Sequence, residues 1–254
     1  MDLGLTDRVY LVTGASRGLG RACAQLLADE GARLVVASRD EVAITEAAQA
    51  IGAADRVAAL PADLASPDAA QQLVAAAIGR FGRLDGALVS VGGPPGGSAM
   101  DLGDDVWRQA FEQVFLGALR VVRAVATAAS SEGASVVLVL SSSVRSPIRG
   151  LAISNGLRPG LAMVAKDLAD ELGPRRIRIN AVMPGRIDTD RVRELDAARG
   201  DAAQARRSNE QNIPLGRYGE PEEFARPAVF LLSPAASYVT GTVLAIDGGM
   251  LRTP

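Results

Sequence analysis

The chain has 254 residues, of which 48% are hydrophobic and 22% are charged, a composition typical of a globular domain with a full core. Its formal net charge of -2 and its scattered arginines argue against a nucleic-acid-binding surface. With no histidine and a single cysteine, Cys23, the chain lacks the residues of a histidine-based catalytic triad and of the commonest zinc sites, so we expect no metal site.

The N-terminal segment, residues 1–8, has neither a basic region nor an apolar run. We therefore expect no signal peptide and no membrane anchor, and a cytoplasmic protein. No Pro-, Gly- or Ser-rich linker and no abrupt change in composition divides the chain. The sequence accordingly predicts one domain over residues 1–254, with no nucleic-acid partner and no membrane partner.

The first predicted unit is a strand at 9–12, a glycine-containing turn at 13–20 and a helix at 21–30 that ends at Gly31. Gly14, Gly18 and Gly20 allow the backbone to approach a ligand closely, and the free amides at the start of a helix attract an anion. This unit predicts a pyrophosphate site. An ordinary strand-to-helix turn is the alternative interpretation.

Strands and helices then alternate along the chain. We predict strands at 33–38, 56–60, 84–91, 135–140, 178–182 and 243–246, and helices at 41–51, 68–81, 102–129, 159–172 and 222–232. The strands are continuous apolar runs, which suit strands buried on both faces, and the helices between them supply right-handed crossovers. The predicted fold class is α/β: a Rossmann-type, doubly wound parallel sheet of about seven strands with helices on both faces.

The segment at 189–213 has a different composition from the rest. Residues 191–211 are polar and charged, interrupted by Leu195, and they follow the carboxyl end of a predicted strand. Ligands bind at this edge of a doubly wound sheet, so we predict that residues 189–213 form a mobile lid inserted over the substrate. A solvated helical insertion is the alternative.

With these elements in place, the chain resembles the short-chain dehydrogenase/reductase family over nearly its whole length. Residues 13–20 match the family's Thr-Gly-x-x-x-Gly-x-Gly loop, and residues 180–189 resemble its nicotinamide-side segment. The segments 213–217, 221–223, 240–241 and 247–249 follow its C-terminal pattern. The resemblance implies nicotinamide dinucleotide binding, a small-molecule carbonyl or alcohol substrate and usually a homodimer or homotetramer.

The end of the second strand predicts which cofactor binds. An acidic residue there would bind a ribose 2′-hydroxyl, whereas an arginine accommodates a 2′-phosphate. Ser38 stands where NAD-preferring relatives tend to place Asp, Arg39 follows it, and Arg17 can approach the same phosphate. We therefore predict NADP(H) in preference to NAD(H). Two surface arginines without this role are the alternative.

The cofactor-binding residues that we expect come from the loop, from the strand ends and from the segment after the sixth strand. They are Gly14, Ser16, Arg17, Gly18, Leu19, Gly20, Ser38, Arg39, Asp63, Leu64, Ser90, Gly92, Pro184, Gly185, Ile187 and Thr189. In this set, Asp63 and Leu64 stand where the family contacts adenine.

The catalytic positions depart from the family's pattern. The family transfers a proton with a Tyr, lowers that Tyr's pKa with a Lys four residues later, orients the substrate with a Ser and supports a water relay with an Asn. Counted from residues 168–172, the Tyr position falls on Ser154 and the Lys position on Arg158, while the Asn position falls on Val114. The serine is retained as Ser142 by local pattern, although the usual spacing fits Ser141 slightly better.

Two further features surround these positions. Pro159 disfavours helical dihedrals at the residue before it, so we expect the helix to start there, with Ser154 and Asn155 in the preceding loop. The family's Asn-Asn-Ala-Gly segment is replaced by residues 90–93, followed by a Gly/Pro run that ends at Gly97. This run either borders the nicotinamide or forms a rigid surface loop.

Two hypotheses from different classes follow. In the first, the protein is an NADP(H)-dependent oxidoreductase with a non-standard site. Ser142 positions a carbonyl oxygen, Arg158 binds the nicotinamide ribose or a developing oxyanion, and the proton comes from water, Ser154 or an acidic substrate. In the second, it is a catalytically inactive dinucleotide-binding sensor, scaffold or partner subunit. The two hypotheses differ in whether the site can supply the proton that turnover requires.

Overall fold

The computed structural model describes residues 1–198 and 200–253. Its centre is one seven-stranded sheet in the order β3-β2-β1-β4-β5-β6-β7, with every neighbouring pair parallel. The strands are β1 (Val9–Thr13), β2 (Arg33–Ser38), β3 (Val57–Pro61), β4 (Gly86–Val89), β5 (Ala134–Val139), β6 (Ile177–Pro184) and β7 (Val243–Ile246). The order reverses between β1 and β4, so a crevice opens there at the carboxyl ends of the strands.

The apolar runs of the strands are buried on both faces of the sheet. Side chains alternate across a strand: in β1, Val9 and Leu11 join the hydrophobic core on one face, whereas Tyr10 and Val12 join the core on the other. All residues of β1 and β5 are buried. The predicted fold class, a doubly wound parallel sheet covered on both faces, is confirmed.

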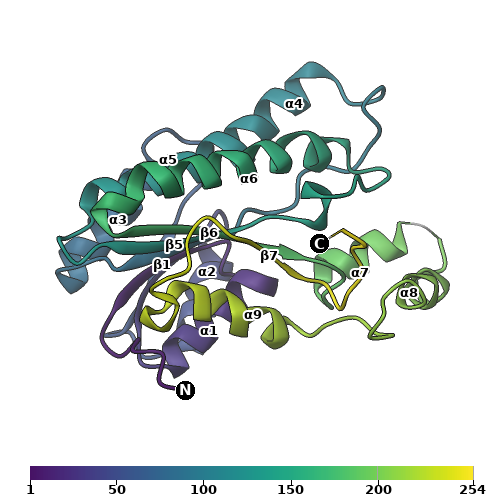
Figure 1. Ribbon diagram of the computed structural model, residues 1–254. Helices are drawn as coiled ribbons and strands as arrows, with labels where there is room; N and C mark the ends of the chain where they lie inside the picture. The colour runs from purple at the N-terminus through teal and green to yellow at the C-terminus, as the bar shows by residue number, and fades with distance from the viewer. Residues whose placement is uncertain (199, 254) are drawn as a thin grey trace.

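Two layers of helices cover the sheet (Figure 1). One layer contains α3 (Ala69–Phe81), α5 (Gly117–Ala128) and α6 (Ala152–Leu172), and the other contains α1 (Gly18–Asp29), α2 (Glu41–Ile51) and α9 (Pro221–Leu232). In the described part of the chain, no helix combines the length and the hydropathy needed to cross a bilayer.

The prediction of where α6 begins was wrong. This helix begins at Ala152 and contains Pro159, so Ser154 and Asn155 lie in its first turn and not in a loop. Contacts to the preceding loop hold that turn. Ile148 donates its backbone N–H to Asn155 Oδ1 at 2.9 Å, and Asn155 Nδ2 donates to the Ile148 carbonyl at 2.9 Å. These contacts override the local preference of Pro159.

The predicted long helix at 102–129 is found as three consecutive pieces. These are α4 (Asp104–Ala110), a π-helical turn at Phe111–Leu116 and α5. A π-helical turn inserts an extra residue into the helix, which changes the direction in which the side chains before and after it point. Val114, on this turn, is 1% exposed and belongs to the buried apolar residues.

The segment at 189–213 folds into two short helices, α7 (Asp190–Ala197) and α8 (Ala202–Glu210). They stand beyond the carboxyl edge of the sheet, next to the C-terminus (Figure 1). Thr189 caps α7 by accepting a hydrogen bond from the backbone of Val192, and Asp201 caps α8 by accepting from Ala203 and Gln204.

Candidate active site

A large cleft lies at the carboxyl edge of the sheet and has a volume of about 1750 Å³. It is lined by residues at the ends of five strands: Thr13 of β1, Ser38 of β2, Ser90 after β4, Val139 of β5 and Pro184 of β6. The cleft therefore lies where the reversal of strand order opens the crevice.

At one end of the cleft, glycines bring backbone segments into close contact. Gly14 has φ +62°, and a Cβ on it would lie 2.6 Å from the carbonyl oxygen of Ser90. A Cβ on Gly20 would lie 2.3 Å from the carbonyl oxygen of Gly14. Side chains are excluded at both positions, so the loop between them stays narrow and its backbone borders the cleft.

The start of α1 faces this loop with unoccupied backbone amides. Its N-cap residue, Arg17, makes no side-chain capping bond, and no acidic residue lies in the first turn. The amides and the positive end of the helix dipole are therefore available to an anion. Arg17 itself is exposed and lies 3.4 Å from Glu194 of α7, measured from Nη1 to Oε1.

The end of β2 adds further positive charge to the same region. Arg39, together with Arg21 of α1, lines the cleft, and Arg39 forms no ion pair with any described residue. Ser38 Oγ donates to the carbonyl of Asp40 at 3.2 Å, while Asp40 caps α2 by accepting from the Ala43 amide at 2.9 Å. Asp40, the acidic residue that follows Arg39 in the chain, is therefore engaged in capping α2.

Almost all of the predicted cofactor residues line this cleft. They are Gly14, Ser16, Arg17, Gly18, Leu19, Gly20, Ser38, Arg39, Leu64, Ser90, Gly92, Pro184, Gly185, Ile187 and Thr189. The remaining one, Asp63, lies outside the lining and accepts the backbone N–H of Ala65 at 3.0 Å.

At the other end, the three predicted catalytic residues Ser142, Ser154 and Arg158 come together on the cleft wall. Ser154 Oγ lies 3.0 Å from Ser143 Oγ, whereas Ser141 Oγ accepts the Ser143 N–H at 3.1 Å. Ser142 is 4% exposed, and its hydroxyl has no hydrogen-bond partner among the described residues. Both Ser141 and Ser142 line the cleft. Ser141 Oγ already accepts one hydrogen bond, whereas the Ser142 hydroxyl accepts none from a described residue.

Arg158 is a buried cation, 6% exposed. Its Nη1 donates to the carbonyls of Val139 at 2.8 Å and Leu140 at 2.9 Å, which fixes the guanidinium at the end of β5. Burial, with a smaller contribution from the positive charge of Arg191, lowers the pKa of Arg158 to about 10. The group remains protonated at neutral pH.

The Gly/Pro run at 92–97 forms part of the cleft wall. Gly92, Gly93, Pro94 and Gly96 line it. Gly97 donates its N–H to the Gly150 carbonyl at 2.7 Å, and its own carbonyl accepts from Ala152 at 3.2 Å. The run is thereby fixed against the start of α6. That the run borders the nicotinamide stays a prediction.

Sequence reasoning missed several side chains of the lining, and two of them lie near the predicted catalytic residues. Gln113, beside the buried Val114, faces the cleft because the π-helical turn changes the direction of side chains there. Arg191 of α7 reaches across to donate from Nη2 to the Pro94 carbonyl at 3.0 Å. Nothing in the sequence indicated the π-helical turn, and Arg191 was one of many charges in its segment.

The tyrosines and the lysine of the chain lie elsewhere. Tyr10 is buried in β1 and donates to the Leu232 carbonyl at 3.4 Å, while Tyr238 is fully exposed. Tyr218 donates to Asp196 Oδ2 at 2.8 Å. Lys166 lies 3.7 Å from Asp170 on the exposed side of α6. Within the described residues, no tyrosine and no lysine lines the cleft.

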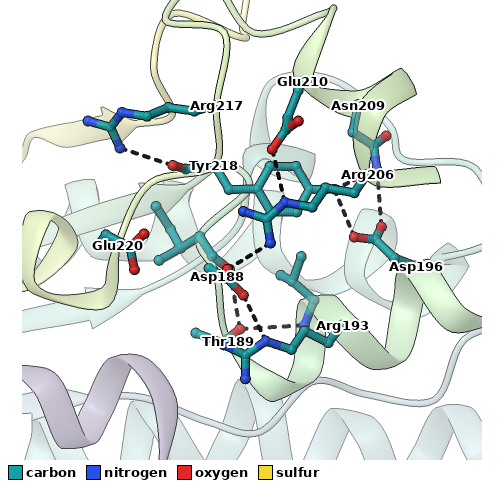
Figure 2. Close-up of polar contacts among 12 residues, drawn as sticks. Asp188, Thr189, Arg193, Asp196, Arg206, Asn209, Glu210, Arg217, Tyr218 and Glu220 are labelled. Atoms are coloured by element: carbon teal, nitrogen blue, oxygen red, sulfur yellow. Dashed lines mark hydrogen bonds and ion pairs between the residues drawn. The ribbon is translucent and has the colours of Figure 1, made fainter. Parts of the chain in front are cut away.

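Ion pairs fix α7 and α8 to the loop that follows β6 (Figure 2). Asp188 Oδ2 lies 2.7 Å from Arg206 Nη1, and Asp188 Oδ1 lies 2.9 Å from Arg193 Nε. The hydrogen bond from Arg206 is the main reason why the pKa of Asp188 lies below its ordinary value. Asn209 donates to both Asp196 and Tyr218. These contacts set the position from which Arg191 reaches the cleft.

Comparison with known proteins agrees with this geometry. The family model described as "Enoyl-(Acyl carrier protein) reductase" matches residues 14–251. An L-rhamnose 1-dehydrogenase (NAD(P)(+)) of Azotobacter vinelandii is 36% identical over 256 residues, with 97% of each chain covered. An uncharacterized oxidoreductase of Mycobacterium tuberculosis is 38% identical over 97% of this chain and 93% of the relative.

Solved structures share the architecture. The L-sorbose reductase of Gluconobacter frateurii, solved with NADPH and L-sorbose, superposes with a TM-score of 0.93 at 30% identity, and all of both chains is covered. A short-chain dehydrogenase/reductase of Brucella melitensis gives a TM-score of 0.90 at 30% identity over 98% of each chain.

Proposed function

The chain belongs to the short-chain dehydrogenase/reductase family, and from that premise we propose that it is an NADP(H)-dependent oxidoreductase with a non-standard active site. It transfers a hydride between the nicotinamide and a carbonyl or hydroxyl carbon. One observation carries the proposal: a single cleft joins the glycine loop and Arg39 at one end to Ser142 and Arg158 at the other. Segment 189–213 serves as its lid.

The residues at the end of the cleft formed by β1, α1 and β2 suit a dinucleotide. The close approach at Gly14 and Gly20 excludes side chains at these two positions, so their backbone borders the space before α1. The uncapped amides of α1 supply hydrogen-bond donors for a pyrophosphate. We expect Gly14, Ser16, Gly18 and Leu19 to hold that group.

The preference for NADP(H) over NAD(H) is supported by charge. Arg39 and Arg17 line the cleft beside Ser38. The carboxylate that follows Arg39 is Asp40, and it caps α2, so we do not expect it to bind a ribose 2′-hydroxyl. A guanidinium group binds a phosphate dianion through paired, charge-assisted hydrogen bonds. We expect Arg39 to make the larger contribution, because Arg17 also faces Glu194.

When bound, NADPH supplies a hydride to the carbonyl carbon of the substrate. Ser142 donates its hydroxyl hydrogen to the carbonyl oxygen and thereby orients the carbonyl. As the carbon gains the hydride, the electron pair of the C–O π bond moves to the oxygen, and the fixed positive charge of Arg158 stabilises the developing negative charge. Stabilisation by a preorganised charge is a large contribution to catalysis.

We propose that Ser154 and Arg158 occupy the positions at which the family has its Tyr and Lys. Arg158 holds its proton too tightly to act as a shuttle at neutral pH. The Ser154 hydroxyl is joined to Ser143, and no basic or acidic group among its bonded partners would make it a strong acid. Water that enters the cleft is therefore the proton donor, and Ser154 orients it.

Calorimetric titration with NADPH and NADH, followed by assay of carbonyl reduction, tests the proposal. We expect NADPH to bind more tightly than NADH, and Ser142→Ala to lower kcat by about 100-fold with little change in NADPH affinity, as for removal of one oxyanion donor. Equal affinities would remove the NADP(H) preference. NADPH binding without reduction of any carbonyl compound would favour a sensor or scaffold.

A further inference from the structure

The buried guanidinium of Arg158 has unused hydrogen-bond donors. Arginine has five N–H donors in a planar fork, and the bonds to Val139 and Leu140 come from Nη1 alone. Nε and Nη2 form no hydrogen bond with a described residue, and no fully buried side-chain nitrogen among the described residues lacks a partner. Nε and Nη2 are therefore open to the cleft that Arg158 lines.

Within the described part of the protein, no acidic residue neutralises the positive charge of Arg158. Burial and Arg191 are the influences that lower the pKa of Arg158, and no carboxylate opposes them. Among the residues that the structure describes, four acidic ones line the cleft: Asp40, Glu46, Asp190 and Glu194. Asp40 and Glu46 belong to the start and body of α2, whereas Asp190 and Glu194 lie on α7 and pair with arginines of their own.

Arg191 brings a second positive charge to the same end. A Cβ on Gly93 would lie 2.8 Å from Arg191 Nε, so the side chain packs directly on the Gly/Pro wall. Its ion pair with Glu194 is long, 3.7 Å from Nη1 to Oε2, and Glu194 also faces Arg17. Positive charge therefore exceeds negative charge where the substrate is expected to bind.

We propose that the substrate is a carbonyl compound that also carries a carboxylate, and that this carboxylate binds between Arg158 and Arg191. This rests on the proposed function. The free edge of Arg158, formed by Nε and Nη2, matches the two oxygens of a carboxylate. Burying a cation without a partner raises the free energy of the folded protein, and two neighbouring cations repel each other. An anion bound between them offsets the desolvation and reduces the repulsion.

The proposal explains why an arginine is suited to this position. Its charge is retained despite burial, and its fork uses one nitrogen to fix itself to β5 while the opposite edge stays free for a ligand. In a 2-oxo acid, the carboxylate and the reacting carbonyl are adjacent, so one guanidinium is close to both. We therefore expect 2-oxo acids to be preferred over their esters.

Titration calorimetry of the NADPH complex with oxamate and N-phenyloxamate, two unreactive analogues of 2-oxo acids, tests the proposal. Oxamide is the uncharged control. We expect both carboxylates to bind and oxamide not to bind. Arg158→Met and Arg191→Met should each weaken carboxylate binding at least about tenfold, the loss expected for one charge-assisted contact. Arg158→Lys should restore part of the affinity.

The control variant is Lys166→Met, which removes a positive charge from the exposed side of the same helix and should leave the affinity unchanged. Binding of oxamide as tightly as oxamate, full carboxylate affinity in both arginine variants, or failure of both carboxylates to bind would overturn the proposal. Arg191 lies on the outer helix α7, so Arg191→Met keeps the test valid if Arg158→Met does not fold.

Titration of the same proteins with NADPH separates the two proposals. If the wild-type protein does not bind NADPH, the proposed function fails. If NADPH binds and neither carboxylate does, this inference alone fails. If Arg158→Met weakens NADPH binding and leaves carboxylate binding unchanged, Arg158 contacts the nicotinamide ribose and the carboxylate assignment is wrong. If Arg191→Met does the same, Arg191 contacts NADPH and the carboxylate assignment is wrong for this residue too.

Discussion

The two ends of the cleft are built in different ways. At the end formed by β1, α1 and β2, the ligand surface is mostly backbone, and its shape depends on positions such as Gly14 and Gly20, where a side chain would collide with a carbonyl oxygen. At the end formed by β5 and α6, the surface is made of the side chains of Ser142, Ser154 and Arg158. Side chains can be exchanged while the backbone is preserved. The family's fold is therefore compatible with an altered catalytic end.

The largest effect should follow from a change to the backbone-built end. Gly14→Ala places a Cβ 2.6 Å from the Ser90 carbonyl oxygen at φ +62°. Strain of this kind amounts to about 1–3 kcal/mol, so we expect a loss of NADPH affinity of up to about 100-fold. Calorimetric titration measures it.

Gly82→Ala is the matched control. Gly82 has φ +76°, and an added Cβ there meets no atom within 4 Å. This variant carries a comparable backbone penalty away from the cleft, so it should lower thermal stability and leave NADPH affinity unchanged. Equal losses of NADPH affinity in both variants would mean that general destabilisation, and not the shape of the loop, causes the effect.

A smaller effect should follow from Arg39→Ala at the same end. Removing one guanidinium from a phosphate site should weaken NADPH binding about tenfold, whereas NADH, which lacks the 2′-phosphate, should bind as before. Arg108→Ala, on the exposed surface of α4, is the control. If NADH affinity falls in parallel with NADPH affinity, Arg39 contacts a part common to both cofactors.

A still smaller effect is expected from Ser154→Ala at the side-chain-built end. If water donates the proton and Ser154 orients it, kcat should fall by less than about tenfold, below the range of about 100- to 10,000-fold for general acid–base catalysis. NADPH affinity should not change. A fall of 1,000-fold or more, on the order of a lost catalytic acid, would identify Ser154 as the proton donor.

The smallest effect is a pH dependence of carboxylate binding at the side-chain-built end. The pKa of Arg158 is lowered to about 10, so the group is cationic below that pH and loses its charge as the pH rises through it. Carboxylate binding to the NADPH complex should therefore fall about twofold by that pH relative to pH 8. In Arg158→Lys, the same experiment should follow the pKa of the new lysine. A constant carboxylate affinity across this range would exclude Arg158 as the partner.

The sequence predicted the sheet and the glycine turn that borders the cleft because both depend on short-range patterns. Apolar runs fix the strands, and glycines fix the turn after β1, so the residues predicted in that turn line the cleft. Their role in cofactor binding stays a prediction. The start of α6 was predicted wrongly. Bonds from Asn155 to the backbone of Ile148, together with the anchoring of Arg158 on β5, stabilise a helical turn that Pro159 disfavours locally.

The remaining parts of the site depend on contacts between distant segments. Arg191 reaches Pro94 across 97 positions of sequence, and Gln113 faces the cleft because of a π-helical turn. Local patterns carry no signal for either. The free edge of Arg158 was also hidden, since it depends on which of its nitrogens bind β5.

We propose that the side-chain-built end supports hydride transfer without the family's Tyr and Lys. Transfer of deuterium from NADPH labelled at C4 of the nicotinamide tests it most directly. Incubation with a series of 2-oxo acids and their esters, followed by mass spectrometry, should detect one deuterium on the carbinol carbon of the product, more rapidly from acids than from esters. The label should disappear with Ser142→Ala together with Arg158→Met. A protein that binds NADPH tightly and transfers no deuterium to any of these compounds would contradict the claim.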